Sequence, residues 1–361
     1  MTEAVLEGVR DLGLERPGGR IVAWSEFGDE AGLPLLRVPG TPGCRYSLRA
    51  DRGPWTRRHL RVITAERPGF GASARLPGRG FGEPADDLAA VLDHLGLEAV
   101  HVMGGSGSAP HQLAFAARHP DRVRAMTVLV GAAPCTGEEA GQMIGLNAEA
   151  HRLVQKGDAE GLRRLMEPIR AAMLEDPVAA FRGVMDRAPA ADRAVMADPQ
   201  WQAELIVASK EALRQGVDGW ADEAFAIASP WDDVDLAAVA ASVTWWHAPK
   251  DANAPLSAAR RLVGHLPNAR LITFSENEGH LAGHLRIAAR TSVVGRASSE
   301  ISRLGLRPPA PLTLTATERV AATARTLPPT PPDGSPRRTG PAGLGTSAGT
   351  IHVGGGPTCM W

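Results

Sequence analysis

A serine at position 106 stands where a strand pattern gives way to a helix pattern. Residues 99–103 (AVHVM) are suited to a strand, residues 104–108 (GGSGS) are all small, and residues 109–119 have the composition of a helix. A sharp strand-to-helix turn admits only small neighbours and holds the serine hydroxyl above the end of the sheet. Ser106 is therefore the candidate nucleophile. The alternative is a glycine-rich turn that carries no chemistry.

A serine hydroxyl needs a base to take its proton and an acid to orient that base. Asp251 follows a predicted strand at 242–246, and His280 follows another at 270–274. The carboxyl ends of parallel strands share one edge of a sheet, so loops after these strands would meet the loop that holds Ser106. The order serine, aspartate, histidine predicts Ser106, Asp251 and His280 as catalytic residues.

Other acids and histidines nearby could replace these partners. His284 lies one helical turn beyond His280, and His247 and His265 stand at element ends where structural roles are commoner. Acids that could replace Asp251 stand several residues past the strand at 125–130 or next to His280; they are Glu138, Glu139, Glu276 and Glu278.

Acyl transfer also needs donors for a developing oxyanion, and these are usually backbone N–H groups. Gly107, directly after the serine, offers one. The second is predicted at Thr41, in the loop 39–43 (PGTPG) after an apolar run at 33–38. The alternative is that these prolines and glycines only form a turn.

The elements that must position these residues follow from periodicity. Strands are predicted at 20–27, 33–38, 61–65, 99–103 and 125–130, with a helix at 83–95 that begins near Pro84 and stops at Gly96. Strands alternating with helices predict a mostly parallel α/β sheet with helices on both faces.

The pattern changes after residue 134. Residues 135–241 show helical periodicity, which predicts an inserted helical cap between a first core segment (1–134) and a second (242–300), the latter with strands at 242–246 and 270–274 and a helix at 255–266. The last helix of the fold is expected within 287–304. Residues 305–361 are rich in proline and glycine and are predicted to be disordered, with a short helix at 317–325.

Composition and charge argue against several classes of partner and location. The formal net charge is −1 and no basic cluster with aromatic residues occurs, so we expect neither nucleic acid nor an anionic membrane as partner. The three cysteines are odd in number and widely spaced, which fits neither a disulfide framework nor a zinc site. No apolar run approaches the roughly 18 residues of a membrane span, and the polar first 20 residues lack a secretory pattern. We expect a cytoplasmic protein without metal or cofactor and of unknown oligomeric state.

Taken together, residues 9–285 resemble the α/β-hydrolase superfamily, in particular its capped members with a serine nucleophile. The resemblance rests on loosely specific motifs in the right order: 39–43 (PGTPG), 66–73 (ERPGFGAS), the turn at Ser106, 119–123 (HPDRV), 250–251 (KD) with Pro255, and 279–281 (GHL). The segments 216–220 and 229–231 look like the cap of a subgroup. The sequence departs from the family at Pro39, where histidine is usual, at Ser108, where glycine is usual, at Glu66, where aspartate is usual, and at Ala248 and Pro249.

The resemblance implies a carboxylesterase-like hydrolase acting on a small-molecule ester, thioester or amide with water, through an acyl-enzyme on Ser106. It also implies Trp220 and Trp231 of the cap as substrate-binding residues. Two alternatives within the fold remain: an aminopeptidase similar to proline iminopeptidases, and a non-catalytic ligand-binding member. A dinucleotide-binding protein is disfavoured, because the glycine series stops at Pro110 and no acidic residue ends the next strand.

Overall fold

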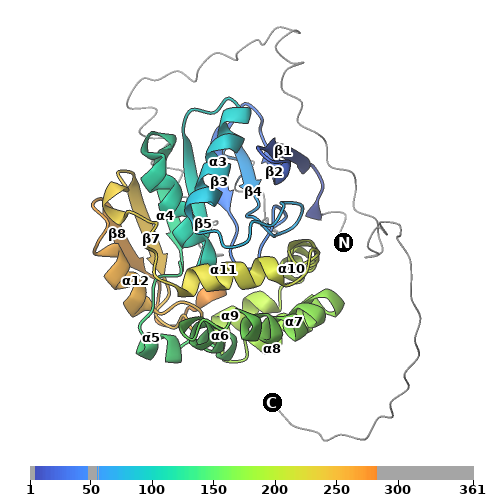
Figure 1. The fold of residues 1–361 in the computed structure, drawn as a ribbon, viewed down its shortest axis with the longest axis vertical. Helices are drawn as coiled ribbons and strands as arrows, with labels where there is room; N and C mark the ends of the chain where they lie inside the picture. Colours follow the sequence, from blue (N-terminus) through green and yellow to red (C-terminus); the bar gives the residue numbers. More distant parts are fainter. Residues whose placement is uncertain (1–4, 48–54, 56, 283–361) are drawn as a thin grey trace, which may run out of the picture. The chain divides into compact units, whose positions relative to one another are not determined.

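The computed structural model describes residues 5–47, 55 and 57–282, which form an eight-stranded sheet covered by helices (Figure 1). The strand order is β1-β2-β4-β3-β5-β6-β7-β8. The pairs β1·β2 and β2·β4 are antiparallel, and all later neighbours are parallel, which confirms the predicted mostly parallel sheet. The strands are β1 (Arg10–Arg16), β2 (Arg20–Gly28), β3 (Leu33–Val38), β4 (Leu60–Ala65), β5 (Val100–Gly105), β6 (Val123–Leu129), β7 (Ser242–His247) and β8 (Ala269–Thr273).

Apolar residues of the parallel strands alternate between the two faces of the sheet. Val102 and Val128 belong to a buried cluster with residues of α3 (Gly82–His94), α4 (Ala109–Arg118) and α12 (Leu256–Val263). Their neighbours Met103 and Leu129 belong to a second cluster, which contains Trp55. Side chains alternate along a strand, so a strand that is apolar at every position has both faces covered. Figure 1 shows α3 and α4 in front of the sheet.

The sequence prediction began the sheet at residue 20 and missed β1. This strand pairs with β2 along its whole length, from Arg10 opposite Glu26 to Arg16 opposite Arg20. Gly13 is its one buried residue, and its only apolar pair in strand spacing, Leu12 and Leu14, is partly buried and flanked by charged residues. Charged residues are typical of edge strands because they discourage pairing with other chains.

Seven helices lie between β6 and β7, in the segment where the sequence predicts a cap; we call residues 137–228 the helical insertion. Aspartate side chains cap α7, α8 and α10: Asp158, Asp176 and Asp198 each accept a hydrogen bond from a first-turn backbone N–H. The helices are α5 (Gly137–Gly141), α6 (Gly145–Gln155), α7 (Ala159–Glu175), α8 (Pro177–Val184), α9 (Ala190–Met196), α10 (Pro199–Ala212) and α11 (Asp218–Ala228), and three short 3₁₀ turns are η1 (Ser106–Ser108), η2 (Pro120–Arg122) and η3 (Leu236–Ala238).

The helical insertion packs on the loops that follow β3 and β4. Leu162 and Trp220 of the insertion share a buried cluster with Cys44 and Phe70 of these loops. In Figure 1, α6 to α9 lie beyond α10 and α11 as seen from the sheet. The insertion therefore meets the sheet at the edge where β3, β4 and β5 end.

The expectations for the helix within 287–304, for the disordered tail at 305–361 and for the helix at 317–325 fall outside the described residues. Within the described part of the chain, the helices lack the combination of length and apolarity that crossing a bilayer requires.

Candidate active site

Ser106 occupies the turn between β5 and α4 with a left-handed backbone, at φ 57°. This conformation is uncommon for a residue with a side chain, and it recurs where function requires it. Gly104 leaves no space beside the turn, since a Cβ there would lie 2.4 Å from the Val38 carbonyl oxygen. The structure thus builds the sharp strand-to-helix turn that residues 104–108 predict.

The departure at Ser108 is accommodated inside the turn. Its buried hydroxyl donates to the Gly105 carbonyl oxygen over 2.8 Å and accepts from Gln112 Nε2 over 2.9 Å. Both hydrogen bonds satisfy a group that would otherwise be buried without a partner. A serine at this position therefore fits where the family usually has glycine.

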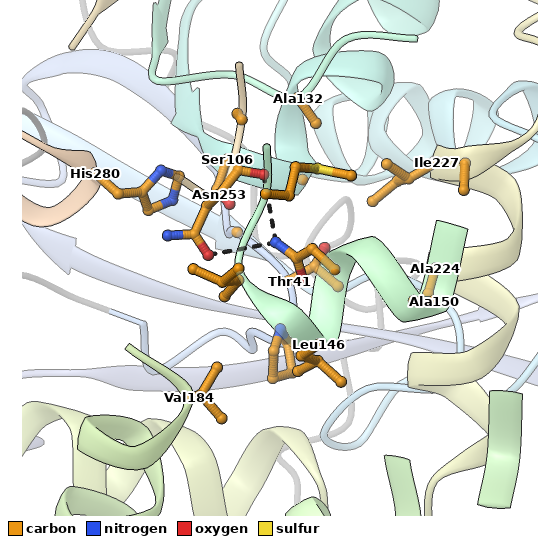
Figure 2. A pocket seen from close by; sticks show the side chains of 18 of the residues that line it. Thr41, Ser106, Ala132, Leu146, Ala150, Val184, Ala224, Ile227, Asn253 and His280 are labelled. Atoms are coloured by element: carbon orange, nitrogen blue, oxygen red, sulfur yellow. Dashed lines mark hydrogen bonds between the residues drawn. The ribbon is translucent and has the colours of Figure 1, made fainter. Parts of the chain in front are cut away.

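Ser106, Thr41, Gly107 and His280 line one cavity of about 280 Å³ (Figure 2). Thr41 follows β3, Ser106 and Gly107 follow β5, and His280 follows β8, so loops at the carboxyl ends of three strands converge there. The helical insertion supplies most of the opposite wall, which is largely apolar and rich in methionine; it includes Met143, Leu146, Met166, Met173, Phe181 and Met185.

His280 and Asp251 form a buried pair. His280 Nδ1 lies 2.7 Å from Asp251 Oδ2, and the other carboxylate oxygen accepts the backbone N–H groups of Asn253 and Ala254 over 2.8 and 3.0 Å. With Nδ1 engaged by Asp251, Nε2 is the nitrogen that would take a proton from a nucleophile. The structure therefore brings Ser106 and His280 to one cavity and Asp251 behind the imidazole, as the sequence predicts.

The pair perturbs both pKa values. Burial by itself would lower the pKa of His280, but the Asp251 carboxylate raises it above its ordinary value. Burial would raise the pKa of Asp251, whereas the imidazoles of His280 and His247 lower it. Asp251 is thus held ionised, in the form that can stabilise an imidazolium.

His247, the histidine at the end of β7, is engaged at both ring nitrogens. Trp245 Nε1 donates to His247 Nδ1 over 3.1 Å, and His247 Nε2 lies 2.8 Å from the Ala254 carbonyl oxygen. These contacts hold the loop that carries Asp251 and give His247 a structural role.

The other acids and histidines that could replace Asp251 or His280 either have other partners, are exposed, or lie outside the described residues. Glu139 pairs with Arg261 Nη1 over 2.7 Å, Glu278 accepts the Ser275 backbone N–H over 3.2 Å, and Glu276 and His265 are exposed. His284 is not among the described residues.

The loop 39–41 and the turn at Ser106 approach each other closely. A Cβ on Gly107 would lie 2.3 Å from Thr41 Oγ1, and a Cβ on Gly40 would lie 3.4 Å from Ser106 Cβ. Only glycine fits at 107, and this allows Thr41 and Gly107 to face the same part of the cavity. This is the place where the sequence predicts two oxyanion donors.

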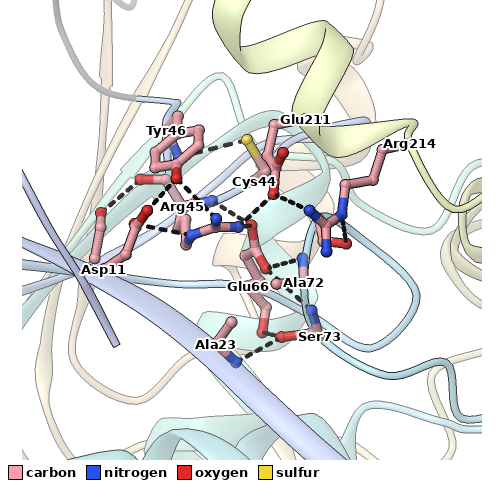
Figure 3. Close-up of polar contacts among 12 residues, drawn as sticks. Asp11, Ala23, Cys44, Arg45, Tyr46, Glu66, Ala72, Ser73, Glu211 and Arg214 are labelled. Carbon is pink, nitrogen blue, oxygen red and sulfur yellow. Dashed lines mark hydrogen bonds and ion pairs between the residues drawn. The ribbon is translucent and has the colours of Figure 1, made fainter. Parts of the chain in front are cut away.

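A buried ionic network holds the segment 66–73 beside this loop (Figure 3). Glu66 accepts the backbone N–H groups of Ala72 and Ser73 over 2.7 and 3.1 Å and pairs with Arg45 Nη1 over 2.7 Å. Arg45 also pairs with Glu211 of α10 over 2.6 Å. Glu66 thus satisfies its carboxylate through partners on both sides, which accounts for a glutamate where the family usually has aspartate.

The two tryptophans predicted to bind substrate differ in position. Trp220 lines the cavity. Trp231 does not: its ring packs edge-on against Phe81 at 5.6 Å between centroids, and its Nε1 donates to the Ile227 carbonyl oxygen over 3.1 Å. Trp231 thus belongs to the main buried core with Phe81 and not to the lining of this cavity.

The described residues contain no group of three or more histidine, cysteine, aspartate or glutamate side chains placed to hold a metal ion. Cys44 is buried, and burial raises the pKa of its thiol well above the ordinary value. Its neutral form makes it an unsuitable nucleophile.

Residues missed by the sequence analysis include Arg67, which donates to the loop 39–41, and two acids of the helical insertion, Asp192 and Glu223. Arg67 lies within the motif 66–73, so its membership of that motif was a signal in the sequence that it has a role near the site. For Asp192 and Glu223, the sequence offers no signal.

Known proteins place the chain in a family. The family model described as alpha/beta hydrolase fold matches residues 34–284. The rhodomycin D methylesterase of Streptomyces sp. (strain C5) is 29% identical over 298 residues, covering 77% of this chain and 96% of that protein. The dihydrolipoyllysine-residue acetyltransferase component of the acetoin cleaving system of Pseudomonas putida is 31% identical over 166 residues, covering 44% of this chain and 43% of that protein.

The chain therefore spans less than half the length of this acetyltransferase component. Among solved structures, a thermophilic esterase from Thermogutta terrifontis superposes with a TM-score of 0.55 at 21% identity, covering 81% of this chain and 98% of that one. That likeness concerns the fold, and the family model covers well over half of the chain. The chain belongs to the α/β-hydrolase family.

Proposed function

We propose that this hydrolase is a serine esterase that cleaves a small-molecule carboxylic ester, or the related thioester or amide, through an acyl-enzyme on Ser106. One observation carries the proposal: a serine with a left-handed backbone and a histidine paired to a buried aspartate face the same cavity. The similarity to a methylesterase and the fold shared with an esterase support the same class of reaction.

In the proposed mechanism, His280 takes the proton of Ser106 as the hydroxyl oxygen attacks the acyl carbonyl. Asp251 orients the imidazole and stabilises its charged form, and the N–H groups of Thr41 and Gly107 bind the oxyanion. His280 then gives its proton to the leaving alcohol. Water, activated by the same histidine, releases the acid.

The cavity favours an uncharged, largely apolar acyl or alcohol group. Its wall is mainly methionine and aliphatic side chains, and its polar points include Asn147, His151 and Asn253. Figure 2 labels Asn253 beside Ser106 and Thr41. Flexible methionines fit irregular apolar shapes. In this proposal, the helical insertion acts as the cap that the sequence predicts at 135–241.

An aminopeptidase fits this cavity less well. An enzyme of that kind must hold the ammonium group of its substrate, and a buried ammonium requires a nearby carboxylate. None of the described residues that line the cavity is an aspartate or a glutamate. Ester turnover should therefore exceed aminoacyl-arylamide turnover.

The decisive test is covalent labelling. A fluorophosphonate probe should label the wild type and fail to label Ser106→Ala, and the variant should lose p-nitrophenyl ester hydrolysis by at least about 10³-fold. Thermal unfolding serves as the control, because both proteins should melt alike. A folded wild type that is neither labelled nor active would overturn the proposal and favour the non-catalytic ligand-binding alternative.

A further inference from the structure

Four buried side chains form an ionic cluster beside the oxyanion loop, and the proposed mechanism does not use them. We call Glu223, Arg67, Arg79 and His111 the Glu223 cluster. Glu223 comes from α11 of the helical insertion and is fully buried. Arg67 Nε lies 2.7 Å from Glu223 Oε1, Arg79 pairs with Oε2, and His111 Nε2 lies 3.0 Å from Oε1.

The charges in this cluster do not cancel. Burial lowers the pKa of His111 to about 4, so the imidazole is neutral at pH 7. Two guanidinium groups, which stay protonated in proteins, then face one carboxylate. Burial would raise the pKa of Glu223, but the charges of Arg67 and Arg79 and the hydrogen bond with His111 lower it well below the ordinary value. The cluster therefore carries a net positive charge next to the site where an oxyanion would form.

Arg67 connects the cluster to the oxyanion loop. Its Nη1 donates to the Pro39 carbonyl oxygen, and its Nη2 donates to the Gly40 carbonyl oxygen over 2.8 Å and to Thr41 Oγ1 over 3.0 Å. Thr41 Oγ1 in turn donates to Glu223 Oε1 over 3.0 Å. One guanidinium thus fixes two successive carbonyl groups, and Glu223 fixes both the guanidinium and the threonine side chain.

Peptide geometry converts these contacts into a direction for the Thr41 N–H. In a planar trans peptide, the C=O of one residue and the N–H of the next point in opposite directions. Arg67 holds the Gly40 C=O on its own side, so the Thr41 N–H points away from Arg67. Ser106 lies against Gly40, at 3.4 Å from the position of a Gly40 Cβ, and lines the cavity with Thr41.

We propose that Arg67, held by Glu223, is the positioning residue of the oxyanion loop, and that the helical insertion controls the proposed esterase reaction through Glu223. This inference rests on the proposed function. It also accounts for Pro39, because a guanidinium bound to the backbone fixes the loop without a histidine side chain at that position.

A purely structural role for the cluster is the competing explanation, since it also fastens α11 to the sheet. The chain offers a matched control. Arg75 Nε pairs with Asp222 Oδ2 over 2.7 Å, and this pair also joins the segment after β4 to α11, one residue before Glu223. The Arg75–Asp222 pair makes no contact with residues 39–41 among its described hydrogen bonds and ion pairs.

The experiment compares Arg67→Met, Arg67→Lys, Glu223→Gln and Asp222→Asn on a p-nitrophenyl ester. Losing one well-aimed oxyanion donor should lower kcat of Arg67→Met by about 10²-fold, with KM changed less than about threefold. Glu223→Gln should lower kcat by about tenfold, because the neutral amide holds Arg67 more weakly. Arg67→Lys should restore part of the loss, and Asp222→Asn should keep wild-type kcat.

A second measurement separates positioning from stability. A trifluoromethyl ketone forms a tetrahedral oxyanion on the serine, so its affinity should fall in Glu223→Gln and Arg67→Lys in parallel with kcat, even if Arg67→Met fails to fold. Wild-type kcat in these two variants, or a loss of kcat in Asp222→Asn that matches theirs, would overturn the inference. Failure of the wild type to be labelled or to hydrolyse esters is a different result, which overturns the proposed function itself.

Discussion

At the scale of residues, the site depends on a few side chains whose protonation is set by their neighbours. His280 is the sensitive one, because opposing influences act on its pKa: burial lowers it, while the Asp251 carboxylate at 2.7 Å and, more weakly, Asp192 raise it. The carboxylates prevail over burial, so the pKa of His280 lies above its ordinary value. Only the neutral imidazole can accept the proton of Ser106.

Activity should therefore rise with pH through a His280 pKa above 6.5. In Asp251→Asn the largest raising influence is gone and only the weaker one of Asp192 remains, so the acidic limb of the kcat/KM profile should move to lower pH. Its plateau should fall by about 10³-fold or more, because the imidazole is no longer oriented. The measurement is the pH dependence of ester hydrolysis. Glu276→Gln, at an exposed rival position, should reproduce the wild-type profile, and an unmoved limb in Asp251→Asn would speak against the pairing.

At the scale of elements, helices of the insertion contact both halves of the candidate site. Glu223 of α11 reaches Thr41 in the loop after β3, and Asp192 of α9 reaches the loop after β8. Asp192 Oδ2 and Oδ1 accept the backbone N–H groups of Leu281 and Ala282 over 3.2 and 3.0 Å. Leu281 and Ala282 directly follow His280, so these two hydrogen bonds fix the backbone that carries the imidazole.

Asp192→Asn should misplace His280. An asparagine keeps one acceptor oxygen and turns an NH₂ toward the second backbone N–H, so one charged hydrogen bond is lost at a cost of about 1–3 kcal/mol. We expect a lower unfolding free energy and a kcat reduced by about tenfold. Urea unfolding and ester kinetics measure the two effects. Asp186→Asn, an exposed change nearby, should alter neither, and full kcat in Asp192→Asn would show that the imidazole is held by Asp251 alone.

At the scale of the whole molecule, ion pairs join the helical insertion to loops and helices around the sheet at several points along the chain. Glu211 of α10 binds Arg45, and Glu139 of α5 binds Arg261 of α12. The Glu139 pair is bidentate, at 2.7 and 2.8 Å, and it lies where the chain leaves the sheet for the insertion. The attachment of the insertion should therefore depend on carboxylate charge.

Glu139→Gln tests this dependence. The hydrogen bonds from Arg261 lower the pKa of Glu139 from 4.5 to about 2, so the pair stabilises the folded state above pH 4.5 and loses this effect as the pH falls toward 2. At pH 7 the unfolding free energy of the wild type should exceed that of Glu139→Gln by about 1 kcal/mol, as expected for a partly exposed ion pair. Urea unfolding at pH 7, 5, 4 and 3 should show a gap that is constant down to about pH 5 and then closes.

Glu138→Gln, at the exposed neighbouring position, is the control and should match the wild type at each pH. A gap that is the same at pH 3 and pH 7 would mean that the carboxylate charge of Glu139 contributes nothing.

Prediction from sequence succeeded where structure is local or follows from strand order. The strands from β2 to β8, the helices α3, α4 and α12 and the turn at Ser106 have periodicities or small residues that require no knowledge of distant partners. Asp251 and His280 could be proposed because parallel strands end at a common edge. The edge strand β1 was missed because its apolar pattern is limited to Leu12 and Leu14 between charged residues. The packing of Trp231 could not be predicted because its partner, Phe81, lies 150 positions earlier in the chain.

The sequence by itself thus determined the mostly parallel sheet, the small-residue turn and the order of the three candidate catalytic residues, since each depends on neighbours within a few positions or on the rule for parallel strands. Only the tertiary structure decided which acids hold the site in place. Thr41 and Glu223 are 182 positions apart, and Asp192 and Ala282 are 90 apart. Such contacts depend on how the helical insertion folds back over the sheet. A single buried carboxylate belongs to no periodic pattern, so the sequence does not indicate which residue it will bind.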